Sequence, residues 1–267
     1  MLKSIRPSQA WFVIGFFVAL LYVFVPWLHD GPLFTAISAS AIVAILIGIR
    51  WTRKELRLPW YLLALGQLMF TLGDAIVYLY PDFTGKELPF PAISDVFYLA
   101  MYPFVLMAGV LLLERVPPER KSLNDWMIFV GTALATGTAM ISPFIMGEKV
   151  IPSLTLLVIA YPILDLVFFS LIAQCFLKPS PPTYFILMAG IGALLIVDTI
   201  YAVGITINAN FDPTGSVLDI GWIAYYICLG AAAITKNGER PFVPVIHKGM
   251  GFKEWLKPGA WEDAYEG

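Results

Sequence analysis

The sequence predicts an all-α integral membrane protein with eight transmembrane helices, and three observations support this fold class. Hydrophobic residues make up 59% of the 267-residue chain and charged residues only 13%, whereas a soluble domain is nearer half apolar and a quarter charged. Most of the chain falls into apolar runs of about 18–26 residues, long enough to cross a hydrocarbon core as helices. The same polar residues recur at the same spacing in both halves of the chain.

Each apolar run is expected to be helical, because a segment in lipid must satisfy its own backbone hydrogen bonds. Turn-forming stretches separate the runs, for example HDGP at 29–32 and KPSPP at 178–182. The predicted spans are residues 10–28, 33–50, 59–80, 92–114, 124–146, 151–177, 183–207 and 215–235.

The basic residues predict the orientation of these spans. Of the 17 lysines and arginines, all but Lys86 and Lys149 fall in segments on one side of the predicted membrane. Those segments are the N-terminus, the loops after the second, fourth and sixth spans, and the C-terminal tail. Because lysine and arginine are enriched in cytoplasmic loops, we expect both termini in the cytoplasm.

The polar residues indicate that the four-helix unit is duplicated in parallel. An offset of 124 positions relates a block in the third and fourth spans to a block in the seventh and eighth. The first block is Asp74, Asp95, Tyr98 and Tyr102, and the second is Asp198, Asp219, Trp222 and Tyr226. Since the second block lies four spans further along the chain than the first, both have the same orientation, as in a parallel repeat about an axis along the membrane normal.

These observations divide the chain into a polytopic membrane domain, residues 1–236, and a cytoplasmic tail, residues 237–267. The repeat halves of the membrane domain cover about residues 10–114 and 124–236. The tail has mixed charge and is too short to form a core of its own. Its aromatic residues Phe252, Trp255 and Trp261 predict docking on the membrane surface or on a protein partner, and a disordered tail is the alternative.

Aspartates within the apolar spans are the main functional candidates. An aspartate inside a membrane costs about 2.5–3.5 kcal/mol even on insertion scales, so such residues usually have a role. Asp95, Tyr98 and Tyr102 share one helix face, and Tyr161 and Asp165 share another near mid-membrane. The candidate ligand-binding residues are Asp74, Tyr78, Asp95, Tyr98, Tyr102, Tyr161, Asp165, Asp198, Tyr201, Asp219, Trp222 and Tyr226.

Three interpretations of this set stay open at the level of sequence. In the first, each aspartate accepts from a nearby tyrosine, tryptophan or helix N-terminus and holds the helices together. In the second, the carboxylates and aromatic rings line an outward-facing pocket for a small or amphipathic ligand. In the third, the carboxylates form a path for protons or cations.

Several other chemistries are disfavoured. The two histidines, His29 and His247, lie in a loop and in the tail, so a haem held by two histidines within the membrane is excluded. No lysine lies within a span, which excludes a retinal Schiff base. The two cysteines are too few for a thiolate metal site, and a net charge of −2 argues against nucleic-acid binding. We expect no cofactor and no catalytic residue.

The segment TLGDA at 71–75 is similar to the glycine–aspartate motif of intramembrane aspartyl proteases. The first glycine of that motif is missing, and the two candidate aspartates, Asp74 and Asp165, are expected at different depths. The sequence therefore predicts a protein that is not an enzyme.

The chain resembles a family of multi-helix membrane input domains found at the N-termini of bacterial and archaeal diguanylate cyclases and sensor kinases. The resemblance lies in segments such as GDAIVYLY (73–80), YPILDLVFF (161–169), DTIYAV (198–203) and GSVLDIGWIAYYICLGAAA (215–233), and covers about 160 residues. It implies a sensor domain in the cytoplasmic membrane of a prokaryote, in which the shared aspartates, tyrosines and tryptophan belong to the input site. The family usually continues into a coiled coil and an output domain, whereas only the tail follows the last span here.

The sequence thus predicts a sensor or receptor-like module that signals through partners. Its expected contacts are the lipid bilayer, a small or amphipathic ligand, and a protein partner bound through the cytoplasmic tail. The alternatives are an accessory or structural subunit of a larger membrane complex and, third, a transporter.

Overall fold

A computed structural model describes residues 6–25, 31–52, 54, 57–86, 88, 91–113, 123–145, 152–175, 182–208, 211 and 215–235. The chain divides into a helical unit, Met1–Thr235, and a second unit, Lys236–Gly267. The second unit, which contains the predicted tail, lies outside the described residues.

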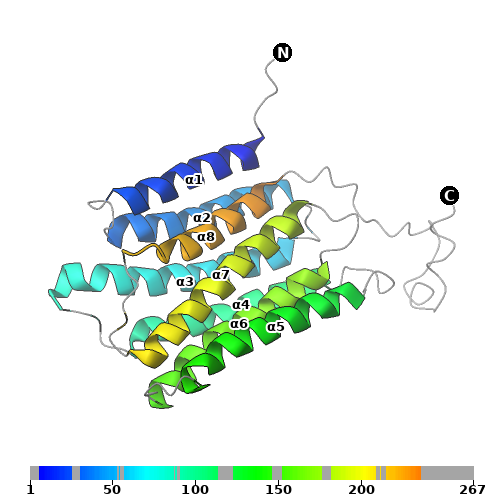
Figure 1. The fold of residues 1–267 in the computed structure, drawn as a ribbon. Helices are drawn as coiled ribbons and strands as arrows, with labels where there is room; N and C mark the ends of the chain where they lie inside the picture. The colour runs from blue at the N-terminus through cyan, green and yellow to red at the C-terminus, as the bar shows by residue number, and fades with distance from the viewer. Residues whose placement is uncertain are drawn as a thin grey trace. The chain divides into compact units, whose positions relative to one another are not determined.

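All regular structure in the described residues is helical, which confirms the predicted all-α fold class. Eight helices follow one another along the chain in this part of the protein (Figure 1). They are α1 (Pro7–Phe24), α2 (Gly31–Trp51), α3 (Arg57–Thr84), α4 (Ile93–Leu113), α5 (Leu123–Ile145), α6 (Pro152–Cys175), α7 (Pro182–Ile207) and α8 (Asp219–Ile234).

Several helix ends differ from the predicted ones: α1, predicted at 10–28, runs from Pro7 to Phe24, since Val25 is extended. A glycine lies next to two of the other ends that differ. Helix α3 continues past Pro81 to Thr84 and stops at Gly85, whose φ of 65° is left-handed and whose N–H donates to the carbonyl of Pro81 at 2.8 Å. Helix α8 begins at Asp219 rather than at 215, because Gly215 has a φ of 73° and the next residues form turns.

Five of the described helices, α1, α2, α3, α4 and α7, are long and apolar enough to cross a membrane. Shorter apolar stretches are described in α6 (Ile159–Cys175) and α8 (Asp219–Ile234). Many large apolar side chains point outward, such as Phe16, Phe17 and Phe24 of α1, which are all more than half exposed. The described helices are therefore compatible with a multi-pass membrane protein.

Helices distant in the sequence pack together in the helical unit. Helices that are neighbours along the chain also pack together: α2 with α3, α3 with α4, α6 with α7, and α7 with α8. Helix α8 also packs against α1 and α2, and α4 packs against α6, so that each half of the chain contacts the other (Figure 1). These contacts bring the polar residues of the two halves into one core.

Helix α2 approaches its neighbours closely through two glycines. A Cβ atom on Gly31 would lie 2.1 Å from the carbonyl oxygen of Tyr78, and one on Gly48 would lie 2.2 Å from that of Ala233. No side chain fits at either position, since backbone atoms cannot move aside as a flexible side chain can. Glycine is thus required where α2 meets α3 and α8.

Helix α1 packs against α8 and is tied to it by a polar contact. Tyr22 is the buried residue of this helix. The indole N–H of Trp11 donates to the carbonyl of Ile227 at 3.0 Å, which ties α1 to α8.

Candidate functional site

Five buried aspartates form the polar centre of the helical unit. We call Asp74, Asp95, Asp165, Asp198 and Asp219 the carboxyl cluster. None of them is more than 8% exposed. Burial of a carboxylate is costly unless hydrogen bonds replace its water, so the donors around each one decide what it can do.

Asp74 on α3 accepts hydrogen bonds from three other helices. Tyr98 of α4 donates to its Oδ1 at 3.1 Å, and Tyr226 of α8 donates to its Oδ2 at 2.7 Å. The hydroxyl of Ser38 on α2 is also hydrogen-bonded to this carboxyl. Gln67 of α3 supports Ser38 by donating to its Oγ at 3.1 Å. Asp74 therefore joins α2, α3, α4 and α8.

Asp198 on α7 accepts a hydrogen bond from α8 with the same sequence spacing as the bond between Tyr98 and Asp74. The indole N–H of Trp222 on α8 donates to Oδ1 of Asp198 at 2.7 Å. The two partners are 24 residues apart, as are Asp74 and Tyr98. In each case an aromatic side chain donates to an aspartate 24 residues earlier: a phenol O–H in the first half of the sequence and an indole N–H in the second.

Asp219 begins α8 and accepts from the N-terminal half of the chain. Tyr22 of α1 donates to its Oδ2 at 2.6 Å, and Tyr78 of α3 donates to its Oδ1 at 2.8 Å. The backbone N–H of Gly215 also donates to Oδ2, at 2.9 Å. The first turn of a helix favours a negative charge, which adds to these bonds.

Asp95 lies in the first turn of α4 and has a donor for each oxygen. The hydroxyl of Tyr161 on α6 donates to Oδ1 at 2.6 Å, and the backbone N–H of Ala92 donates to Oδ2 at 2.7 Å. The second bond caps the start of α4. Asp95 therefore fixes the helix start and ties it to α6.

Asp165 on α6 is fully buried and has one donor from another helix. The hydroxyl of Tyr102 on α4 donates to its Oδ1 at 2.9 Å. Its Oδ2 has no hydrogen-bond donor among the described residues. The carboxyl of Asp165 is also in hydrogen-bond contact with the carboxyl of Asp198 on α7.

Aromatic rings pack around the cluster. The ring of Phe70 lies 5.2 Å from that of Tyr98, 5.5 Å from that of Tyr226 and 5.8 Å from that of Tyr225. Tyr201 is also one of the predicted site residues, and its ring lies 6.3 Å from that of Trp222. All twelve predicted residues thus lie in the cluster or in its aromatic surroundings.

Sequence reasoning missed several members of this site. Tyr22, Ser38, Gln67 and Tyr225 are buried within it and do not belong to the repeated pattern. A signal was present for two of them: Ser38 and Gln67 are polar residues within apolar spans. Tyr225 precedes Tyr226 in the sequence, and no sequence feature predicts that its hydroxyl is buried as well.

The chemistry of the site is that of acceptors surrounded by neutral donors. The described basic side chains, such as Arg50, Arg57 and Lys86, lie at helix ends rather than beside the cluster. Within the described residues, no group of three or more His, Cys, Asp or Glu side chains is arranged to hold a metal ion. The arrangement can bind and release protons or exchange hydrogen-bond partners.

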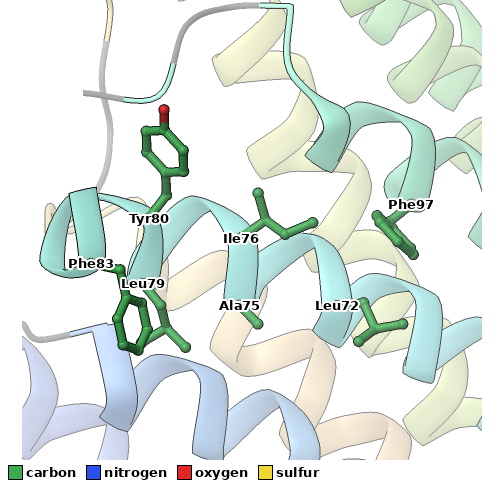
Figure 2. Close-up of a pocket in the computed structure, with 7 residues that line it drawn as sticks. All are labelled: Leu72, Ala75, Ile76, Leu79, Tyr80, Phe83 and Phe97. Atoms are coloured by element: carbon green, nitrogen blue, oxygen red, sulfur yellow. The ribbon is translucent and has the colours of Figure 1, made fainter. Parts of the chain in front are cut away.

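A shallow apolar groove lies on the opposite side of α3 from Asp74. It has a volume of about 320 Å³ and is open on one side. Figure 2 shows six of its residues along α3 and one on α4. They are Leu72, Ala75, Ile76, Leu79, Tyr80, Phe83 and Phe97. At about 100° per residue, these α3 positions face away from Asp74, so the groove and the carboxyl cluster are separate.

Comparisons of the chain with protein-family models, with curated proteins and with solved structures found no match.

Proposed function

We propose that this chain is a sensor or receptor-like module of a prokaryotic cytoplasmic membrane, with the carboxyl cluster as its responsive element. The observation that carries the proposal is that each aspartate of the cluster contacts a side chain on a different helix. Any event that changes the charge of one carboxyl, or occupies its acceptor oxygens, changes contacts between helices. A bound ligand or proton can therefore bias helix packing, which is the property that a membrane sensor requires.

The duplication is part of this proposal. The bonds Tyr98–Asp74 and Trp222–Asp198 have the same spacing and the same helix relationship, α4 to α3 and α8 to α7. Contacts between the halves agree with a twofold arrangement, since α2 meets α8 as α6 meets α4. We propose a parallel four-plus-four repeat of eight transmembrane helices, with the cluster at the junction of its halves.

The charge distribution supports an orientation with both termini in the cytoplasm. In that orientation Asp95 and Asp219 lie near the outer ends of α4 and α8, because these helices start on the outer side. A ligand would then reach the cluster from outside the cell. The cytoplasmic ends of the helices and the tail would pass the change to a protein partner.

Native mass spectrometry of the full chain, extracted gently from its own membranes, tests the sensor proposal. We expect a bound small or amphipathic molecule that is lost in the variants Asp74→Asn and Asp198→Asn. The matched control is Thr206→Ala, because the buried hydroxyl of Thr206 donates to the carbonyl of Ala202 in its own helix. Folded protein in which wild type and every variant show only the mass of their own bare chain would argue against a ligand pocket.

The apolar groove on α3 favours a second candidate, an accessory subunit of a larger membrane complex. Its aliphatic and aromatic walls fit an apolar side chain from a partner's transmembrane helix. In the same experiment, this function would give a stoichiometric protein partner that is released by the substitution Ala75→Trp in the groove. Loss of the partner by Asp74→Asn alone would instead connect it to the cluster.

A further inference from the structure

Asp165 and Asp198 are the two members of the carboxyl cluster that contact each other. Asp165 is 0% exposed and Asp198 is 8% exposed. An ionised carboxyl has only acceptor oxygens, whereas a protonated carboxyl has one O–H donor. A direct contact between two buried carboxyls is therefore held together when a proton lies between them, and is repulsive when both are ionised.

The donors around this pair are fewer than around the rest of the cluster. Asp165 receives one hydrogen bond, from Tyr102, and its Oδ2 has no donor in the described part of the protein. Asp198 receives one from the indole of Trp222. Asp95, by contrast, has a donor for each of its two oxygens. A proton shared between the two carboxyls would supply a donor that Asp165 otherwise lacks.

In the first half of the chain, the helix pair α2 and α3 supplies the aspartate of α3 with a different kind of donor. Between α2 and α3, the hydroxyl of Ser38 faces Asp74 and donates to it. Between α6 and α7, the residue that faces Asp198 is Asp165, an acceptor unless protonated. One half therefore carries a permanent donor, and the other carries a donor that depends on pH.

The groups that face the pair from the surrounding helices are neutral. They are Tyr102 from α4, Trp222 and Tyr225 from α8, and Tyr161 and Tyr201 on α6 and α7 themselves. The hydroxyl of Tyr225 has no hydrogen-bond partner among the described residues, although its ring is almost fully buried. No described lysine or arginine lies beside the pair to stabilise two negative charges.

We propose that Asp165 and Asp198 form a proton-binding site, in which one proton is shared between the two carboxyls and ties α6 to α7. Release of this proton to water leaves two adjacent carboxylates that repel each other. The helices then separate until water reaches the pair. This inference rests on the proposed sensor function, because it identifies the proton as a ligand of the same carboxyl cluster.

Infrared difference spectroscopy of the full chain in lipid nanodiscs, recorded as the pH is raised, tests this proposal. The C=O stretch of a protonated carboxyl is separate from the bands of carboxylates, and deuterated water shifts it. We expect wild-type protein to show this band and to lose it on alkalinisation, with release of one proton per chain. The variants Asp165→Asn and Asp198→Asn should each lack the titrating band.

Two further variants test whether the titrating band comes from this pair of carboxyls. Asp95→Asn removes a carboxyl that already has two donors, so the titrating band should remain. Tyr102→Phe keeps both carboxyls but removes the donor to Asp165, so the band should shift in frequency and titrate over a different pH range. If an Asp→Asn variant fails to fold, the shift in Tyr102→Phe still assigns the band to the pair.

Three results would overturn the proposal: no protonated-carboxyl band at any pH, a band unaffected by Asp165→Asn and Asp198→Asn, or a band lost on adding sodium chloride but not choline chloride. The last result would show a cation site. None of these measurements depends on a signalling partner, so a proton found here would stand even if the sensor function were wrong. Conversely, a ligand detected on Asp74 without the proton would leave the sensor function standing.

Discussion

The hydroxyl of Tyr226 donates to Oδ2 of Asp74 at 2.7 Å, although the two residues are 152 positions apart. This bond joins α8, at the end of the helical unit, to α3 in its first half. A second bond from Tyr98 of α4 reaches the other oxygen of the same carboxyl. Asp74 thus holds together helices that only the folded state brings into contact.

Removal of the Asp74 carboxyl should therefore destabilise the helical unit. We expect Asp74→Ala to lower the free energy of unfolding by about 1–3 kcal/mol for each hydroxyl that is left buried without a partner. Asp74→Asn should cost less, because its amide oxygen still accepts one bond. Thermal unfolding in detergent measures the difference. The control Thr206→Ala removes a buried hydroxyl that bonds within its own helix and should have a small effect.

The paired bonds Tyr98–Asp74 and Trp222–Asp198 should have similar coupling energies. Double-mutant cycles with Asp74→Asn and Tyr98→Phe, and with Asp198→Asn and Trp222→Phe, measure each one. Interhelical hydrogen bonds in membrane proteins contribute about 0.6 kcal/mol on average and at most about 1.7 kcal/mol. A coupling near zero in one cycle and large in the other would argue against equivalent roles in the two halves.

The substitution Gly48→Ala should separate α2 from α8. Its new methyl group would meet the carbonyl oxygen of Ala233 at 2.2 Å, so the helices must move apart and lose packing. We expect a lower unfolding temperature in detergent. Gly137→Ala in α5 is the matched control, because nothing lies within 4 Å of its new methyl group. Alanine there should be neutral or stabilising by up to about 1 kcal/mol.

The hydroxyl of Tyr22 should be needed to hold α1 in place. Tyr22→Phe removes its bond to Asp219 and leaves the Trp11–Ile227 bond in place. Hydrogen exchange of the α1 amides should become faster, while exchange in α3 stays unchanged. Tyr61→Phe, at an exposed tyrosine of α3, is the control. Unchanged exchange in α1 would mean that its apolar contacts are sufficient.

The orientation can be tested with single cysteines at exposed lysines. In a background with Cys175→Ala and Cys228→Ala, a membrane-impermeant maleimide should label Lys86→Cys in intact cells. Lys54→Cys should be labelled only after permeabilisation, because the charge distribution places it in the cytoplasm. Both side chains are exposed, so access through the membrane decides the result. The reverse pattern would invert the proposed topology.

The helices could be predicted from the sequence because each apolar run is continuous and long. The hydrogen-bond partners could not. Tyr78 shares a helix face with Asp74, yet it donates to Asp219 of α8. Its direction is decided by how closely α2, α3 and α8 approach one another, and that depends on Gly31 and Gly48. Helical spacing gives neighbours within one helix, whereas the contacts here lie between helices.

Tyr22 illustrates the same limit more strongly. It is a single tyrosine in an apolar helix and has no counterpart in the repeated blocks, so the sequence pattern gave it no role. The structure places it against Asp219, 197 positions later. Contacts at such separations follow from the packing of whole helices.

These long separations also set the order in which the protein can be assembled on the ribosome. In the membrane topology that we propose, Asp74 and Tyr22 would enter the translocon well before α8, which carries Tyr226 and Asp219. Until α8 is released, both early residues must find temporary partners, such as water at the lipid headgroups or the insertion machinery itself. The final arrangement of α1 and α3 is therefore completed after translation of α8, and a nascent chain halted before residue 219 should be a substrate for membrane quality-control proteases.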